Sequence, residues 1–520
     1  MPVTAPAPSK AAFAVLLLFL ASAAPAAELW ERPWVEVRTD NLRLLSGLDE
    51  RRSREFAVEL ENFRRFVLAV TNLDDVRERV PTTVYLMPER RPEFGLRDGV
   101  AGYLRKTMRS NELVLSPSGG FLDDAIKHEY VHMVVHNHSP RLYPAWFDEG
   151  FAEVLMTFEI KGNDIVFGKV SPLRASWLNA TNQYQQVLEF DRLLSVASPL
   201  VLERDQMGMF FAQSWLLMHY LNFGRPNADL AAEMTEYLDL TAEGMAPPAA
   251  FEQAFGIEVG KLRSVLRKYS TKLPFFRGKM PGPYPADRAS VRAVPADEVA
   301  TQLGWLLMFG GDGAKAAEPY FAAALARNPA NARALAGMGD VRKFGGDFAA
   351  AEALYQRAIE AEPGNALNEL ELGGYYADVA IRAAKAGDAA AAGTAWVEAR
   401  RHYTRSYKIN PDIPETLAMN GMTYLAEGRP DKAVESLEMA WDLYPGNEEI
   451  RLMLAQALMA AGERAAALPH VQTVAARRHG ATSPEFDQWL ADLEGRAAAG
   501  PAAPAGAAAG PAGAGDTAAD

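Results

Sequence analysis

The 520-residue chain contains no cysteine. Disulfide bonds are therefore excluded, and any metal site must be built from His, Asp or Glu side chains. The chain also lacks a block of lysine and arginine residues that could neutralise a run of phosphates. Its 53 basic residues are outnumbered by 66 acidic ones, which gives a net charge of −13. This balance argues against a nucleic acid as partner.

Long apolar runs are missing after residue 27. The first 27 residues, MPVTAPAPSKAAFAVLLLFLASAAPAA, contain one lysine, an apolar stretch over 11–20 and an A-x-A pattern at Ala24 and Ala26. This pattern is typical of an export signal. The alternative is an uncleaved anchor, but the apolar run is short against the roughly 20 residues that a membrane span needs. We therefore predict a signal peptide at 1–27, a mature chain without a transmembrane span, and a periplasmic or secreted location.

Short apolar runs and one helical stripe predict an α+β region over residues 28–276. Four runs, WVEVRT, LRLLSG, TTVYLM and ELVLS, are typical of strands. Apolar residues at steps of three and four predict a helix over 49–71, and from Leu122 to Phe276 the pattern is mostly helical. Residues 277–296 are rich in Pro and Gly without periodicity, so we predict a linker between domains there.

Residues 297–496 contain an internal repeat. The stretches FGGDFAAAEALYQRAIEAEPGN and AEGRPDKAVESLEMAWDLYPGN match in phase, and a degenerate further copy follows at Gly462. The prolines that close the copies, Pro329 and Pro363, lie 34 residues apart, as do Pro411 and Pro445, while the middle interval carries a 14-residue insertion. This period resembles the tetratricopeptide repeat, which implies an all-α solenoid whose concave face binds a peptide or a protein partner. Residues 497–520 form an Ala/Gly/Pro tail that we expect to be disordered.

Four of the eight histidines lie between residues 128 and 138. Within HEYVH, His128 and His132 are four residues apart, which places both imidazoles on one helix face about 5–6 Å apart at Cβ. Glu129 projects beside them. This is the H-E-x-x-H pattern, in which two histidines bind zinc and the glutamate acts as general base on water.

A third protein ligand is needed if a fourth position is to stay open for water. The stretch PAWFDEGFAEVL begins with Pro144, a favourable first-turn residue, and predicts a second helix that presents Asp148, Glu149 and Glu153. We take Glu149 as the third ligand. Glu153 lies one turn further on, where it can orient a ligand histidine from behind, and Asp148 is a second candidate for that role.

HEYVH followed by WFDEGFAE resembles the gluzincin metallopeptidases, especially the aminopeptidase-N-like and peptidase-MA-like proteins. The resemblance spans about residues 34–269 and is specific between 127 and 154. It implies an α+β zincin-like fold, a Zn²⁺ cofactor, a peptide or protein substrate, His128, His132 and Glu149 as metal ligands, and Glu129 as catalytic base.

The chain departs from the aminopeptidase pattern at two places. Where that branch has a tyrosine that stabilises the transition-state oxyanion, an alignment on Tyr220-Leu221 gives Phe211, which cannot donate a hydrogen bond. That donor is then either missing or supplied from elsewhere, with His219 and Tyr184 as the candidates. The stretch DGVAGYL also lacks the glutamate that reads the substrate amine in that branch, so a typical aminopeptidase is not expected.

The sequence thus predicts an exported zinc metallopeptidase joined to a protein-binding repeat domain. The alternative is a non-catalytic scaffold of the cell envelope with a structural or vestigial metal site. Glu129 favours the enzyme, because a purely structural site has no use for a general base. Phe211 favours the scaffold.

Overall fold

The structure of the protein, a computed structural model, describes residues 28–71, 73, 80–97, 102–116, 124–138, 143–162, 164–179, 187–196, 199, 202–280, 282–308, 313–478 and 483–495. The expected signal peptide, the C-terminal tail and Tyr184 lie outside these residues. Among the described helices, none combines the length and apolarity that crossing a bilayer requires.

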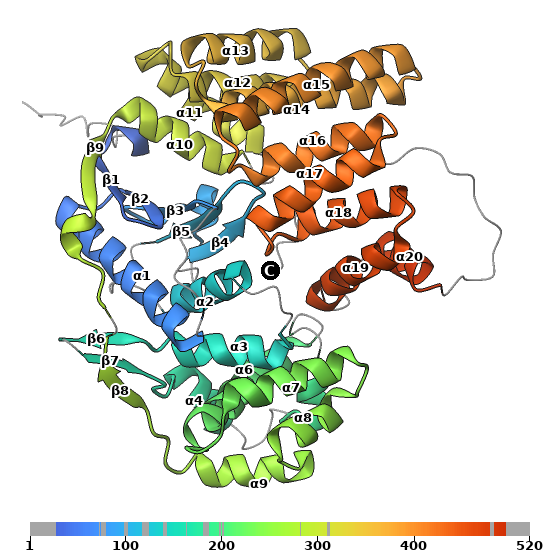
Figure 1. The fold of residues 1–520 in the computed structure, drawn as a ribbon. Coiled ribbons are helices and arrows are strands. Elements are labelled where there is room, and N and C mark those ends of the chain that lie inside the picture. The colour runs from blue at the N-terminus through green and yellow to red at the C-terminus, as the bar shows by residue number, and fades with distance from the viewer. Residues whose placement is uncertain are drawn as a thin grey trace, which may run out of the picture.

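A six-stranded mixed sheet forms the centre of the molecule, with strand order β4-β5-β3-β2-β1-β9 (Figure 1). Strands β2, β3 and β5 run parallel, while β4, β1 and β9 are each antiparallel to their neighbours. The strands are β1 (Trp34–Arg38), β2 (Leu42–Ser46), β3 (Thr82–Leu86), β4 (Gly102–Lys106), β5 (Asn111–Leu115) and β9 (Ser290–Val294). The four strands predicted from sequence are β1, β2, β3 and β5.

Both faces of this sheet are buried, each in a different core. Alternate residues of a strand point to opposite faces, so Leu44 packs with Phe63 of helix α1 (Glu50–Thr71), while Leu45 packs with Leu303 of helix α10 (Ala296–Leu307). Helix α2 (Asp124–His138) shares the first core with α1. The sheet is therefore enclosed by N-terminal helices on one face and by the first repeat helices on the other.

The segment expected to be a linker, residues 277–296, instead contains strands of two sheets. Strand β9 pairs with β1, and β8 (Phe276–Lys279) pairs with β7 (Asp164–Phe167), which in turn pairs with β6 (Glu159–Lys161). Sequence periodicity failed here because both strands are edge strands with mostly exposed side chains, and Val294 alone of β9 is buried. An exposed edge strand shows no apolar alternation.

A helical lobe below the sheet carries the second half of the N-terminal region (Figure 1). Its helices are α3 (Ala145–Leu155), α4 (Pro172–Asn179), α5 (Phe190–Ser195), α6 (Arg204–Phe223), α7 (Leu230–Ala242), α8 (Pro247–Phe255) and α9 (Val259–Tyr269). Helix α3 packs closely on α6 because Gly150 has no side chain: a Cβ there would lie 2.5 Å from the carbonyl oxygen of Ser214. This close contact fixes α3 against the buried side of α6.

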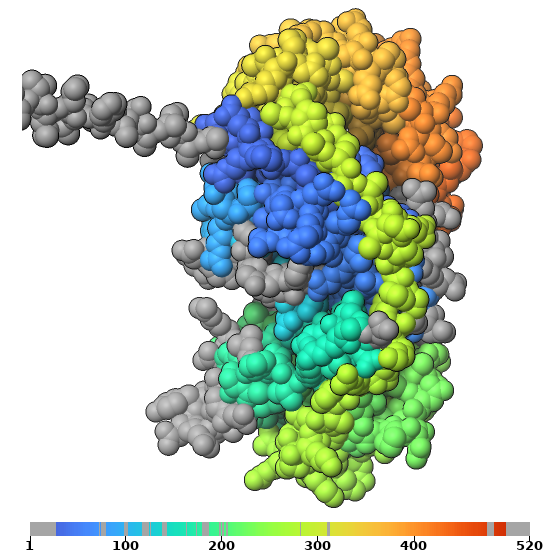
Figure 2. Space-filling view, turned by 90° about the vertical axis from the view of Figure 1, so that its left-hand side faces the viewer, coloured from blue at the N-terminus to red at the C-terminus, as the bar shows by residue number. Residues whose placement is uncertain are grey.

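The C-terminal half is a solenoid of paired helices that curves around the sheet (Figure 1). After α10 the helices are α11 (Gly313–Arg327), α12 (Ala332–Phe344), α13 (Phe348–Ala361), α14 (Ala366–Lys385), α15 (Ala389–Ile409), α16 (Pro414–Ala426), α17 (Pro430–Leu443), α18 (Glu448–Ala460), α19 (Arg464–Arg478) and α20 (Pro484–Leu493). In Figure 2 the yellow-green segment with β9 and α10 lies along the blue N-terminal elements.

Repeat positions identified in the sequence have clear local roles. Gly346 and Gly428 lie between the two helices of a pair with φ of 85° and 70°, a left-handed conformation that favours glycine. The 14-residue insertion is divided equally: α14 has 20 residues against 13 in α12, and α15 has 21 against 14 in α13. Each helix of that pair is thus about two turns longer, which leaves the repeat register unchanged.

Candidate metal centre

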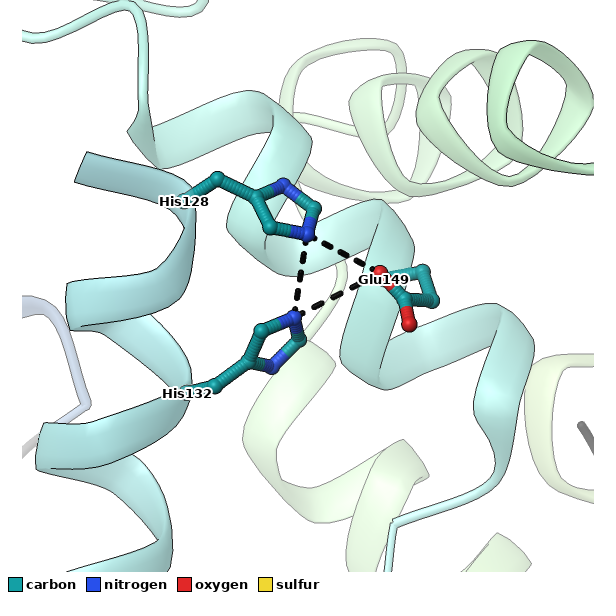
Figure 3. Close-up of side chains that lie close together, drawn as sticks. All are labelled: His128, His132 and Glu149. Atoms are coloured by element: carbon teal, nitrogen blue, oxygen red, sulfur yellow. Dashed lines mark hydrogen bonds and ion pairs between the residues drawn. The ribbon is translucent and has the colours of Figure 1, made fainter. Parts of the chain in front are cut away.

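Three donor atoms predicted from the sequence converge between α2 and α3 (Figure 3). His128 Nε2 lies 3.0 Å from Glu149 Oε2, His132 Nε2 lies 3.1 Å from His128 Nε2, and His132 Nε2 lies 3.4 Å from Glu149 Oε2. Donors about 2.0–2.1 Å from a tetrahedral zinc ion are separated by about 3.3 Å. The arrangement therefore fits one zinc ion with three protein ligands.

The two helices hold these side chains by ordinary packing. Helix α2 buries Tyr130, Val131 and Val134 in the core beneath the sheet, so the other face, with His128 and His132, turns toward α3. The four-residue spacing places the two imidazoles one turn apart, edge to face, with ring centroids separated by 4.7 Å. Helix α3 then supplies the carboxylate from across the gap.

A carboxylate lies behind each ligand histidine. Glu153 Oε1 lies 3.5 Å from His128 Nδ1, and Asp148 Oδ1 lies 3.3 Å from His132 Nδ1. Such partners fix the orientation of an imidazole ligand and increase its basicity. Glu153 and Asp148 thus lie where a supporting role requires them, and the role itself stays a prediction.

Two further residues complete this support. Arg174 of α4 donates two hydrogen bonds to the fully buried Glu153, one of them 2.8 Å long. His136 Nε2 lies 3.1 Å from Asp148 Oδ2. The position of His136 one turn after His132 is a signal in the sequence that points to this role. Nothing local indicated Arg174, which lies 21 residues from Glu153 on another helix.

His132, His136 and Asp148 form a second cluster of potential ligand atoms within 4.8 Å of one another. His132 belongs to both clusters. Its Nε2 faces Glu149 and its Nδ1 faces Asp148. A neutral imidazole has one acceptor nitrogen, so a cation at the first cluster leaves the proton of His132 on Nδ1, the nitrogen that faces Asp148. His136 and Asp148 of the second cluster then support His132, the residue that both clusters share.

Electrostatics at the centre suit a cation. Burial alone would raise the pKa of Glu149, but His128 and His132 outweigh it and lower that pKa to about 2. Burial would lower the pKa of His132, yet Asp148 and Glu149 hold it well above its ordinary value. Burial lowers the pKa of His136, with Asp148 opposing the shift only in part. The ligand carboxylate is thus ionised throughout the physiological range.

Two of the residues that the sequence analysis connects with catalysis, Glu129 and Phe211, lie beside the candidate centre. Glu129 is solvent-exposed on α2, next to His128 in the chain, as a group that meets water and substrate must be. Phe211 of α6 does face the centre: its ring centroid lies 6.3 Å from that of His128, and the Arg174 guanidinium lies 5.0 Å from the phenyl centroid. This geometry is consistent with the sequence alignment, which places an aromatic ring at position 211 beside the candidate ligands.

His219 is not brought to the centre, contrary to expectation. It is fully buried, its Nε2 lies 2.8 Å from the carbonyl oxygen of Gly168, and its Nδ1 lies 2.8 Å from the hydroxyl of Tyr269. The physical reason is distance along α6, because eight residues after Phe211 correspond to about 12 Å of helix. Both ring nitrogens are engaged in packing α6 against α9 and the β7–α4 loop.

Comparisons with known proteins concern the helical half. Residues 301–373 and 424–493 match family models described as tetratricopeptide repeat. The C-terminal half therefore carries tetratricopeptide repeats. This confirms the repeat that the proline spacing predicted, and such repeats are modules of protein binding. None of the curated proteins compared with the chain matches it.

Several solved structures are similar to part of the chain. A thermophilic tetratricopeptide-repeat protein of Thermus thermophilus is 21% identical with a TM-score of 0.33, and the match covers 38% of this chain and 98% of that one. PilF of Pseudomonas aeruginosa is 18% identical with a TM-score of 0.32 and coverages of 38% and 84%. MamA of Desulfovibrio magneticus is 13% identical with a TM-score of 0.28 and coverages of 36% and 97%. At these values the similarities carry no argument about function.

Proposed function

We propose that the protein is an exported zinc-dependent metallopeptidase of the gluzincin type with a zincin-like catalytic region and a repeat domain for protein binding. The observation that carries the proposal is the convergence of His128, His132 and Glu149 at zinc-ligand separations, with Glu129 exposed beside them. Export rests on the signal peptide that the sequence predicts at residues 1–27. The substrate is a peptide or protein, and the departures from the aminopeptidase pattern make a typical aminopeptidase the poorer choice.

The side chains have separable roles in this scheme. A zinc ion, when bound, supplies a Lewis acid that polarises the scissile carbonyl and lowers the pKa of water. Glu129 takes the proton from the attacking water and returns it to the leaving amine. Glu153 and Asp148 hold the two ligand imidazoles in the required orientation. Phe211 closes one side of the centre with an apolar ring that donates no hydrogen bond.

The decisive experiment combines metal analysis with one substitution. We expect one zinc per chain, lost in His128→Ala and Glu149→Ala because each removes one of three ligands. Glu129→Gln keeps size and shape, so it should retain zinc and lower peptide hydrolysis by about 10²–10⁴-fold. Metal content is measured by elemental analysis and activity with an unbiased peptide library. Hydrolysis that persists unchanged in Glu129→Gln would assign it to a contaminating protease.

A second function, a non-catalytic envelope scaffold, is favoured by Phe211 alone. Its ring stands beside His128, where a hydroxyl could reach a developing oxyanion and a phenyl ring cannot. Phe211→Tyr adds only that hydroxyl. If the protein is an enzyme, we expect this substitution to raise the hydrolysis rate. A wild-type protein that binds zinc but cleaves no library peptide, together with an inert Phe211→Tyr variant, would establish the scaffold instead.

A further inference from the structure

The turn between β4 and β5 reaches into the concave side of the repeats. At its tip, Arg109 donates to both oxygens of Glu415 on α16, one contact being 2.7 Å, and to Glu371 on α14 at 2.7 Å. These are the first helices of successive repeats. Arg333 of α12, the first helix of the preceding pair, also donates to Glu371, at 3.3 Å. One side chain of the N-terminal region thus contacts the inner helices of two repeats and borders a third.

The site matches a guanidinium group closely. The side chain of Arg109 is 16% exposed, that of Glu371 10% and that of Glu415 16%. A planar guanidinium can bind one carboxylate with two parallel hydrogen bonds and still reach a second, which a lysine cannot do. Burial would lower the pKa of Arg109, but Glu371 and Glu415 outweigh it and hold that pKa above its ordinary value. The carboxylates of Glu371 and Glu415 on the concave face therefore already bind an arginine of the same chain.

A second contact lies between the repeats and the metal-binding helix. In the turn before α18, Tyr444 donates to Asn111 Oδ1 at 2.7 Å and Asn447 donates to the carbonyl oxygen of Thr107 at 3.3 Å. In the same turn, a Cβ on Gly446 would lie 2.8 Å from the carbonyl oxygen of His136. One turn of the solenoid thus touches both the β4–β5 hairpin and the end of α2.

The hairpin and α2 are also directly linked. Helix α2 packs against β4, the first strand of the hairpin. His136 in turn contacts Asp148, which supports the ligand His132. A continuous set of contacts therefore runs from the repeat domain to the candidate metal centre.

We propose that the concave face of the repeats is an internal receptor for the β4–β5 turn, with Arg109 as the bound side chain, and that this docking positions α2 at the metal centre. The second part rests on the proposed function, whereas the first does not. Arg109 and Gly446 are positioning residues. An external peptide that uses the same part of the groove has to compete with Arg109, so a partner that presents arginine would loosen the metal-binding helix.

The test uses the full-length chain loaded with Co²⁺ as a spectroscopic probe. Arg109→Ala should increase amide hydrogen exchange in residues 102–116 and 124–138, change the visible Co²⁺ spectrum and weaken Co²⁺ binding by about tenfold or more, the range found when an outer support of a metal ligand is lost. Arg109→Lys keeps the charge without the two-pronged geometry and should restore part of each effect. Gly446→Ala, which alters only the contact with α2, should reproduce the changes in 124–138.

Exposed Arg51 of α1, which pairs with Glu55, supplies the control: Arg51→Ala should leave every readout unchanged. Wild-type exchange and Co²⁺ affinity in both Arg109→Ala and Gly446→Ala would overturn the proposal, and Gly446→Ala decides it if Arg109→Ala does not fold. Faster exchange confined to 102–116 would uphold the docking and overturn the positioning of α2. A wild-type chain that binds no Co²⁺ would refute the proposed function, while hydrogen exchange would still test the docking.

Discussion

At the scale of single residues, the support behind His128 depends on Arg174. Glu153 is fully buried, and its two oxygens are bound by the Arg174 guanidinium. Removing one partner of a buried pair leaves an uncompensated charge, which costs about 3–5 kcal/mol. The pair therefore contributes to both the stability and the orientation of the centre.

Arg174→Met should accordingly lower zinc affinity about 10–100-fold and lower the free energy of unfolding. Affinity is measured by competition with a chromophoric chelator and stability by urea denaturation of the metal-free chain. Arg192→Met, which replaces an exposed arginine bonded to Gln206, is the matched control. Equal zinc affinity in both variants would show that Glu153 orients His128 without help from Arg174.

Glu36 gives a prediction about pH. It is buried in β1, and burial raises its pKa, but hydrogen bonds from Arg38, Arg292 and Arg43 outweigh this and lower the pKa from 4.5 to about 2. A depressed carboxyl pKa stabilises the fold above the unfolded value, and that contribution is lost as pH falls through the folded value. Its contribution should therefore be complete above pH 4.5 and decline toward pH 2.

Glu36→Gln should then cost about 2 kcal/mol at pH 7, the order expected for hydrogen bonds to a charged group. The difference from wild type should shrink between about pH 4.5 and pH 2. Urea denaturation at several pH values measures it. A difference that is constant over this range would mean that the substitution disturbs packing rather than removing a charge.

At the scale of elements, two adjacent glycines in α14 allow the effect of close packing to be measured separately from the effect of helix propensity. A Cβ on Gly373 would lie 2.6 Å from the ring of Tyr403, whereas a Cβ on Gly374 would meet nothing within 4 Å. Gly373→Ala should destabilise the repeats by about 1–3 kcal/mol through overpacking. Gly374→Ala should stabilise them by up to about 1 kcal/mol because alanine favours a helix interior. Thermal denaturation of the two variants checks the opposite signs.

Elements with a one-sided apolar pattern were predictable from sequence, and the exceptions share a cause. Helix α1 and strand β3 have such a pattern, and the candidate metal ligands follow from the spacing within α2 and from the acids of α3. Strands β4 and β9 lie at the edges of the sheet, where the half-buried side chains of β4 and the mostly exposed side chains of β9 carry no alternation. Edge strands are defined by partners distant in sequence, which local patterns cannot indicate.

Within the candidate site the same limit applies. His128 and Glu149 could be predicted because each lies on a short segment with its own motif. Arg174 and the tertiary role of His136 depend on how α4 and α3 approach α2. The expectation that His219 lies at the centre was wrong, because it considered the residue type and ignored the position of His219 along α6. Side chains that act through tertiary contacts become visible only when the helices are placed.

At the scale of the whole molecule, the sheet and the solenoid do not form separate cores. Trp34, Tyr85 and Val114 pack with Leu303 and Phe321 of the first repeat. A chain cut near residue 277 also loses β9, the partner of β1. The boundary predicted at the Pro/Gly-rich segment therefore does not divide two independently packed units.

A fragment of residues 28–276 should consequently be insoluble or far less stable than the full chain, because it exposes one face of the sheet and the edge of β1. A fragment of residues 28–344, which adds β9 and α10 to α12, should recover most of the sheet's stability. Solubility and thermal midpoint of the two fragments, measured beside the full chain, provide the check. A fully stable 28–276 fragment would contradict the shared core.

The pairing of β1 with β9 also sets the order in which the molecule can be finished during synthesis. Glu36 and Arg292 are 256 residues apart in the chain. At about 5–20 residues per second, a ribosome needs roughly 13–50 s to cover that distance. Throughout this interval the outer edge of β1 lacks its partner strand β9, and the apolar side chains of Trp34 and Tyr85 lack the repeat helices that cover them. The half of the chain with the candidate metal ligands therefore completes its fold only after the first repeat has emerged.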